Sequence, residues 1–461
     1  MIYKNITQQQ NPLNLLEAQF HKGFRWAVTG SMVYEACKTA HNILLTYYLT
    51  PKEYGLIAST LSFIYLVTKF ADFGASTSIL PFFHLFIKSK QNFKQLFFKF
   101  YLLPHIPLLL FTAITTSTFL AFYSPSNIDT LTLLAISSTI ILESIKSFLR
   151  LFLYTSLECK RTVFIDVSSF LLFLFLVWIP YLFLNSPITL KSILFFHIID
   201  SLMVTIIFSS LFYKIYKNLP SEALNLPVKI KERIIKAKVF NYLLRLSREV
   251  FTSNFLTPFF ALKFGFEYAG LFYLAAVIAH FIQSMFKISV GYLGNAILAN
   301  LKNNTPYEKQ RAFELLTQKL STLISPLIII LFINHSKILR YANCSDLSMA
   351  TMGLALLFLT IQIIDFITSL YEQFYVMEEQ SFKFFCYKAL EFTIFYVFIS
   401  YSKHSQSLST ILLGIISIKM LSFAIVALNA YSNWQIKPKF HTNPRYLVLS
   451  VVIALLAFFI L

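Results

Sequence analysis

Residues 24–55 read FRWAVTGSMVYEACKTAHNILLTYYLTPKEYG, and this stretch decides how the rest of the chain is interpreted. Its first part, residues 24–49, is apolar over more than the roughly 20 residues that a helix needs to cross a bilayer. It is too long for the core of a signal peptide, carries Glu35 and Lys38, and lacks a small-residue cleavage site. We therefore predict a retained membrane-spanning helix.

The end of the stretch predicts a tight turn into a second helix. Pro51 is expected to end the first helix, and Gly55 permits the chain to re-enter the membrane at once. Glu53 is expected to cap the N-terminus of the second helix, because a carboxylate is stabilised by the positive end of the helix dipole.

The composition of the whole chain is that of a membrane protein. Hydrophobic types make up 57% of the 461 residues and charged types only 13%, whereas a soluble chain is about a quarter charged. We predict an all-α, polytopic membrane protein with segments at 24–49, 56–86, 97–122, 131–157, 163–184, 190–213, 240–264, 269–299, 313–333, 347–376, 382–402, 409–432 and 446–461. The last segment is short for a span, so whether it crosses stays open.

Lysine and arginine fall mainly on alternate loops. One set includes Lys4, Lys22 and Arg25 near the N-terminus and a basic linker over 215–239. The opposite set of loops holds only Lys52, Lys191, Lys263, Lys337, Arg340 and Lys403. Because cytoplasmic loops carry an excess of lysine and arginine, we predict a bacterial inner-membrane protein with a cytoplasmic N-terminus. The formal charge of +18 is thereby explained by topology, and no nucleic-acid partner is expected.

An internal repeat lies on either side of the basic linker. Glu53-Tyr54-Gly55 matches Glu267-Tyr268-Ala269-Gly270 with one inserted residue, and Glu35 precedes the first copy as Glu249 precedes the second. Both halves begin on the same side, so they are predicted to be parallel repeats related by an axis along the membrane normal. Two pseudo-symmetric six-helix lobes around a central cavity are a transporter layout. The predicted units are an N-terminal lobe over 1–214, the linker over 215–239, a C-terminal lobe over 240–432, and a loop with the thirteenth segment over 433–461.

Many charged residues lie inside the predicted spans. A charge at the centre of a spanning helix costs on the order of 2.5–3.5 kcal/mol on insertion scales, so such residues need a partner or water. Residues three or four apart on a helix touch. This spacing predicts structural ion pairs that hold the bundle: Glu35–Lys38, Lys69–Asp72, Glu143–Lys146 and Arg245–Glu249.

Other charges at depth have no partner at that spacing. The cations of this kind are candidates for an anion-binding site, because one cation ~4 Å from a phosphate contributes roughly 4 kcal/mol at an effective dielectric near 20. They are Arg248, Lys287, Lys419 and Arg150. Arg150 is near enough to the inner end of its helix to extend its guanidinium to the membrane surface. The acids Asp200, Asp365 and Glu391 are candidates for binding a coupling proton or Na⁺. The alternative, that each acid pairs with one of these cations across helices, stays open.

The chain offers little that indicates catalysis. Its cysteines are scattered singly, without metal-ligand spacing or a disulfide framework. A Gly-rich phosphate loop, a nucleophile–histidine arrangement and a metal-ligand cluster are all lacking, so we expect no enzyme, no cofactor and no metal. His197 and Asp200 are one helical turn apart, which we interpret as a hydrogen bond within the bundle.

The stretch Leu49-Thr50-Pro51-Lys52-Glu53-Tyr54-Gly55, followed by Ser62, Asp72-Phe73-Gly74 and Ile79-Leu80, resembles the N-terminal region of polysaccharide-export and O-antigen flippases. These belong to the multidrug/oligosaccharidyl-lipid/polysaccharide (MOP) exporter superfamily. The resemblance implies a flippase that moves an undecaprenyl-diphosphate-linked oligosaccharide from the inner to the outer leaflet by alternating access, for O-antigen, lipopolysaccharide or another surface polysaccharide. The partners it implies are the lipid-linked oligosaccharide, membrane lipid and a polysaccharide polymerase, for a chain that acts as a monomer.

Three other functions remain. A drug or small-cation exporter of the same superfamily would need a cavity dominated by acids. A membrane polymerase or glycosyltransferase of the same pathway usually carries a sizeable outer loop, which this chain does not have. A passive structural membrane protein is disfavoured, because polar groups at membrane depth usually mark a pathway.

Overall fold

The computed structural model describes residues 12–71, 89–94, 97, 103–123, 129–156, 158–221, 228–300, 310, 314, 331, 333–343, 346–377, 380–401 and 407–434. Within these residues all regular secondary structure is helical. The predicted segment 446–461, most of 313–333, and Asp72 lie outside the described residues. Arg245 and Lys287 lie on described helices, but their side chains are not among those described.

The N-terminal half forms one set of packed helices, which we call the N-terminal group. It contains α1 (Pro12–Tyr48), α2 (Pro51–Ala71), α5 (Lys90–Lys94), α6 (Leu103–Tyr123), α7 (Thr130–Thr155), α8 (Cys159–Leu184) and α9 (Leu190–Lys217). In it α7 packs against α2, α6 and α9, while α8 packs against α1 and α9.

The C-terminal half forms a second set, the C-terminal group. It contains α10 (Val228–Glu249), α11 (Ser253–Phe264), α12 (Phe266–Asn300), α14 (His335–Ala342), α15 (Leu347–Met377), α16 (Ser381–Tyr401) and α17 (Leu408–Trp434). In it α15 packs against α12, α14 and α17, and α16 packs against α10 and α17. The linker predicted over 215–239 is helical from Val228 onward.

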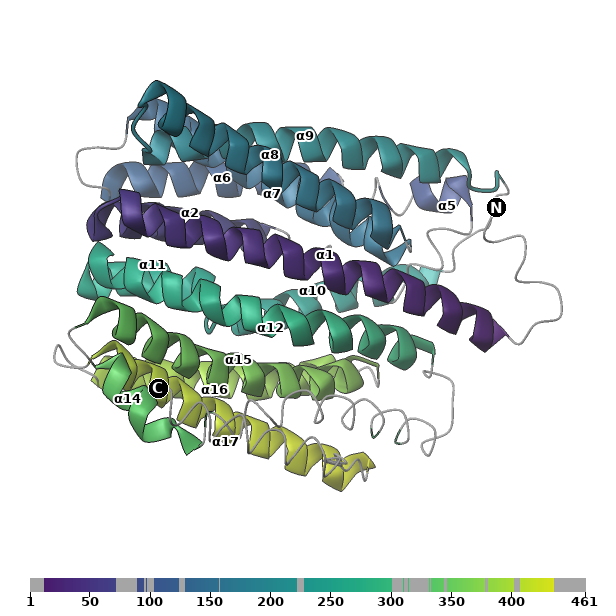
Figure 1. Cartoon of the computed structure of the whole chain (residues 1–461). Coiled ribbons are helices and arrows are strands. Elements are labelled where there is room, and N and C mark those ends of the chain that lie inside the picture. Colours follow the sequence, from purple (N-terminus) through teal and green to yellow (C-terminus); the bar gives the residue numbers. More distant parts are fainter. Residues whose placement is uncertain are drawn as a thin grey trace.

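The two groups meet through α1 and α2 on one side and α11 and α12 on the other. Figure 1 shows α6–α9 along one flank of the molecule and α15–α17 along the opposite flank, with α1 and α12 between them. The interface between the groups is therefore built from the first two helices of each predicted repeat.

Seven of the described helical stretches are long and apolar enough to cross a membrane: Pro51–Ala71, Thr130–Leu153, Lys160–Leu184, Leu190–Lys217, Phe266–Ser284, Ser348–Glu372 and Leu408–Asn433. Large apolar side chains such as Phe183 and Leu428 are exposed on these helices, as expected where acyl chains replace water. The predicted all-α, polytopic membrane fold is confirmed.

The turn at the start of the chain has the geometry of a capping box. The Thr50 backbone N–H and hydroxyl donate to Glu53 Oε2 at 3.0 and 2.7 Å, and the Glu53 N–H donates to the Thr50 hydroxyl oxygen at 3.3 Å. This reciprocal pattern satisfies N–H groups that the first helical turn leaves unpaired. With Pro51 at the first helical position, the turn starts α2 immediately after α1 ends.

The glycines of the two repeated motifs touch each other. A Cβ atom added to Gly55 would lie 1.7 Å from the Phe266 carbonyl oxygen, and one added to Gly270 would lie 3.1 Å from the Gly55 Cα. Equivalent residues of two repeats contact each other only near the axis that relates them. The interface at this end thus depends on the absence of side chains at two matched positions.

The seventh predicted segment, 240–264, is two helices and not one. α10 ends at Glu249 and α11 begins at Ser253. Between them Thr252 takes an extended backbone conformation, with φ −87° and ψ 160°, and its hydroxyl donates to the Glu249 carbonyl at 2.8 Å. Short polar side chains compete with helical hydrogen bonds, which explains a break at Thr252-Ser253-Asn254 inside an otherwise apolar stretch.

We predict that Gly55→Ala destabilises the chain by on the order of 1–3 kcal/mol, because the new methyl group meets backbone that can move only if the helices separate. Gly270→Ala serves as the matched control, since its Cβ would meet the same interface at a far less severe distance. The thermal unfolding midpoint of the detergent-purified variants measures the effect. Equal midpoints for Gly55→Ala and the unmodified chain would contradict the close packing.

Candidate functional site

A cluster of charged and polar side chains joins α7 to α9; we call Glu143, Lys146, His197, Asp200 and Ser201 the N-terminal cluster. Lys146 forms an ion pair with Glu143 on its own helix, and its Nζ lies 3.7 Å from Asp200 Oδ2 on α9. Ser201 donates to Glu143 Oε1 at 2.5 Å. All five residues are buried, so their charges must be compensated within the protein.

His197 connects this cluster to α2. Its Nε2 lies 3.5 Å from Glu143 Oε1 and 3.2 Å from the Tyr65 hydroxyl. The hydrogen bond that the sequence suggested between His197 and Asp200 is thus replaced by contacts to Glu143 and Tyr65.

The N-terminal cluster holds more carboxylates than lysines. With Glu143 and Asp200 ionised and His197 neutral, Lys146 compensates only one of the two negative charges. Asp200 Oδ1 is buried and has no hydrogen-bond partner among the described residues. A buried carboxylate without compensation is costly, and Asp200, whose nearest described cation is Lys146 at 3.7 Å, is the less compensated of the two acids.

The C-terminal group contains a second network, the C-terminal quartet, formed by Asp365 on α15, Lys388 and Glu391 on α16, and Lys419 on α17. Lys419 Nζ lies 2.7 Å from both Asp365 Oδ1 and Glu391 Oε1. Lys388 Nζ lies 2.8 Å from Glu391 Oε2 and 3.7 Å from Asp365 Oδ1. Two ammonium groups therefore balance two carboxylates.

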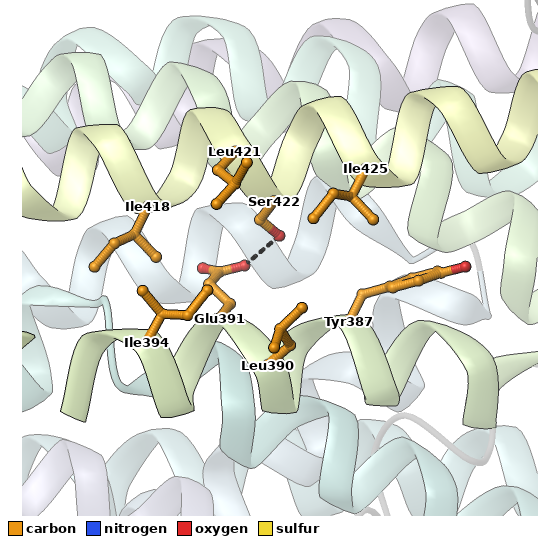
Figure 2. A pocket seen from close by; sticks show the side chains of 8 residues that line it. All are labelled: Tyr387, Leu390, Glu391, Ile394, Ile418, Leu421, Ser422 and Ile425. Carbon is orange, nitrogen blue, oxygen red and sulfur yellow. Dashed lines mark hydrogen bonds between the residues drawn. The ribbon is translucent and has the colours of Figure 1, made fainter. Parts of the chain in front are cut away.

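A shallow notch lies between α16 and α17 beside the quartet. Figure 2 shows apolar side chains around it, with Glu391 and Ser422 facing each other across the gap. The Ser422 hydroxyl donates to Glu391 Oε2 at 2.8 Å, while Leu390 and Leu421 at its rim are exposed. Because Glu391 already contacts two lysines and this serine, the notch is an opening in the outer face of the group rather than an unsatisfied polar site.

In each half an ion pair links the same two helices, and the cation and the acid exchange helices between the halves. In the N-terminal group the cation Lys146 lies on α7 and the acid Asp200 on α9. In the C-terminal group the acid Asp365 lies on α15 and the cation Lys419 on α17. In the predicted segment order these are the fourth and sixth segments of each repeat, so the halves share a connection while differing in net charge.

The cations proposed from the sequence for an anion site have carboxylate partners where their side chains are described. Arg150 contacts Asp166 at 2.7 Å, and Arg248 contacts Glu372 at 3.0 Å. Lys419 belongs to the quartet, and the Lys287 side chain lies outside the described ones. The spacing along one helix could not show these pairs, because each partner comes from another helix.

The predicted structural pairs are arranged in more than one way. Lys38 Nζ lies 3.8 Å from Glu35 Oε2 on the same helix. Lys69 instead contacts Glu249 on α10 at 2.9 Å, across the interface between the two groups. Its predicted partner Asp72 and the Arg245 side chain, predicted to pair with Glu249, both fall outside what the structure describes.

Sequence reasoning missed three members of these networks. Asp166 and Glu372 lie within predicted spans, but neither has a cation three or four residues away, so the spacing rule predicts no partner for them. The pair Lys388–Glu391 was not predicted, although its spacing of three residues is the signal that identified the other pairs.

Solved structures of transporters share this fold. One is a MOP superfamily transporter from Pyrococcus furiosus, for which a reversed polarity of the binding pocket was taken to suggest a different function. It matches with a TM-score of 0.63 and 12% sequence identity, and the match covers 93% of this chain and 99% of that one. An outward-facing multidrug resistance MATE family transporter of the MOP superfamily matches with a TM-score of 0.60 and 14% identity over the same shares. A MATE in complex with MaL6 matches with a TM-score of 0.62 and 12% identity, again over 93% and 99%.

No protein-family model matches the chain, and no curated protein matches its sequence. At these identities the comparison concerns the fold alone. The chain has a MATE-like fold of the kind found in MOP superfamily transporters.

We predict that Lys419→Met destabilises the chain by about 3 kcal/mol, because it leaves the buried Glu391 and the partly buried Asp365 with Lys388 as their one ammonium partner in the quartet. The double variant Lys419→Met with Asp365→Asn restores the balance of charge and is expected to recover much of the loss. The unfolding midpoints of the detergent-purified proteins measure both. A double variant no more stable than the single one would show that charge balance does not stabilise the quartet.

Proposed function

We propose that the chain is a transporter of the bacterial cytoplasmic membrane that works by alternating access, with the two helix groups moving against each other. The MATE-like fold supports this, as does the direct packing of α2 against α11 and α12 around Gly55 and Gly270. With the N-terminus in the cytoplasm, the packed Gly55 end faces outward. The structure then corresponds to a state closed to the outside.

The observation that carries the proposal is the surplus carboxylate of the N-terminal cluster. A buried group that gains and loses a proton or Na⁺ lets an ion gradient favour one arrangement of the helix groups over the other. Asp200 is the proposed coupling residue, with Glu143 beside it. Asp365 and Glu391 were equal candidates from the sequence, but a further cation in their neutral quartet would add uncompensated positive charge.

The first candidate cargo is an organic cation that is exported in exchange for protons or Na⁺. The multidrug MATE transporters of similar fold favour it. The carboxylate contacts of Arg150, Arg248 and Lys419 favour it too, because they neutralise cations on which an anionic cargo was expected to depend.

The second candidate cargo is a lipid-linked oligosaccharide, moved from the inner to the outer leaflet for surface polysaccharide. The stretch from Leu49 to Gly55 supports it by resemblance. Two cations of the inner half also support it, since the side chains of Lys69 and Arg248 remain 31% and 36% exposed although each has a carboxylate partner. Such cations can still meet a diphosphate.

We predict that Asp200→Asn abolishes ion-coupled transport while leaving the amount of folded protein unchanged, because the amide cannot take up the coupling ion. Proteoliposomes with an imposed proton or Na⁺ gradient test this, with ethidium and a fluorescent lipid-linked oligosaccharide as alternative cargos. Asp346→Asn is the matched control, since Asp346 is an exposed carboxylate outside the helices.

The cargo that moves faster with the gradient than without it identifies the substrate class. Gradient-driven transport by Asp200→Asn at the unmodified rate would reject the coupling role of the N-terminal cluster. The absence of gradient-driven movement of either cargo by the unmodified protein would reject the proposed function.

A further inference from the structure

One described ion pair connects the two helix groups across their interface. Lys69 Nζ on α2 lies 2.9 Å from Glu249 Oε2 at the end of α10. The other ion pairs of the described residues join side chains within one group. At 1.5 Å per residue, Lys69 lies about 21 Å along α2 from Gly55. The pair is therefore a charged contact between the groups that lies well away from the glycines.

The two partners differ in their access to solvent or ligand. The Lys69 side chain is 31% exposed, whereas that of Glu249 is 8% exposed. An ammonium group has three N–H donors, so the exposed side of Lys69 can accommodate a second acceptor. Arg248, the residue before Glu249, is 36% exposed and provides another cation at the end of α10.

Glu249 also contacts a residue of the break between α10 and α11. Its Oε2 accepts a hydrogen bond from the Thr252 hydroxyl at 3.2 Å, and Thr252 is the N-cap residue of α11. The positive end of the α11 dipole therefore offsets the unfavourable position of this carboxylate at the C-terminal end of α10. Glu249 can therefore leave Lys69 and still keep favourable contacts within the C-terminal group.

We propose that Lys69 is the centre of an anion-binding site in which the Glu249 carboxylate is the resident anion, and that a phosphate group of a ligand displaces it. The displacement breaks the charged contact between α2 and α10 and so favours separation of the helix groups at this end. The inference rests on the proposed alternating access and assigns one chemical group of the ligand, a phosphate carried either by a lipid or by a soluble molecule.

After the exchange Lys69 keeps an anionic partner, and Glu249 keeps the Thr252 hydroxyl as a neutral hydrogen-bond donor. Removing one member of a buried ion pair is strongly destabilising because the other is left uncompensated. Here the entering phosphate compensates Lys69, and Thr252 with the N-terminus of α11 remains beside Glu249. The pair Lys38–Glu35 lies within α1, and Arg150–Asp166 joins α7 to α8 of the same group, so an exchange there would not release one group from the other.

Binding of inorganic pyrophosphate to the purified, detergent-solubilised chain tests the site. A ligand that binds the native state raises the unfolding midpoint with its concentration, and we expect such a rise for the unmodified protein. Lys69→Gln is expected to lose it. Glu249→Gln removes the competing charge at nearly constant size and is expected to lower the apparent dissociation constant about tenfold.

The control is Glu35→Gln, the same substitution beside Lys38, which is expected to leave the dissociation constant unchanged. Lys69→Arg keeps the cation and is expected to bind, which allows the test to proceed if Lys69→Gln does not fold. No binding by the unmodified protein, binding retained by Lys69→Gln, or equal affinities of Glu249→Gln and Glu35→Gln would each overturn the proposal.

The source of the phosphate is distinguished with farnesyl diphosphate. Tighter binding than that of pyrophosphate supports a lipid-borne phosphate at the site, and equal binding supports a soluble one. These measurements need no transport. A protein that binds pyrophosphate through Lys69 but moves no cargo would thus reject the proposed function and leave the anion site standing.

Discussion

The compensation of buried charge is the constraint on which the described structure depends. Helices that face lipid can carry charged side chains only where another group neutralises them, because each isolated charge at depth is costly. Arg150, Arg248 and Lys419 all meet this requirement through a carboxylate on a different helix. The ion pairs therefore do more than balance charge, because they also fix which helices are neighbours. Apolar packing is non-directional and specifies the neighbours of a helix less sharply.

In both halves an ion pair joins the same two helices, but the surrounding numbers of acidic and basic side chains differ between the halves. The pair Lys146–Asp200 ties α7 to α9, and Asp365–Lys419 ties α15 to α17 with the signs exchanged. The C-terminal quartet is neutral, whereas the N-terminal cluster holds one carboxylate more than its lysine can compensate. The proposed ion-dependent change of state is therefore placed in the N-terminal group.

The sequence predicted the architecture well because apolar length, loop charge and the repeated Glu-Tyr-Gly motif are local signals. It placed the turn between α1 and α2 closely, although α1 begins at Pro12 and not at residue 24, and the motif located the glycines that meet between the groups. The break after Glu249 was missed because a short polar run inside an apolar segment does not disturb hydropathy. Partners such as Asp166 and Glu372 were missed because pairing between helices depends on tertiary contacts, and a rule of three or four residues describes a single helix.

Transport by alternating access requires that the two helix groups, which pack together around Gly55, move relative to each other. The most direct test is the distance between spin labels at Phe183 on α8 and Leu262 on α11, both exposed residues of different groups, in a chain whose native cysteines are replaced. Pulsed electron paramagnetic resonance in lipid nanodiscs should show two populations of this distance, and their proportions should change with pH or Na⁺ concentration. A single distance that is the same under all conditions would contradict alternating access by these groups.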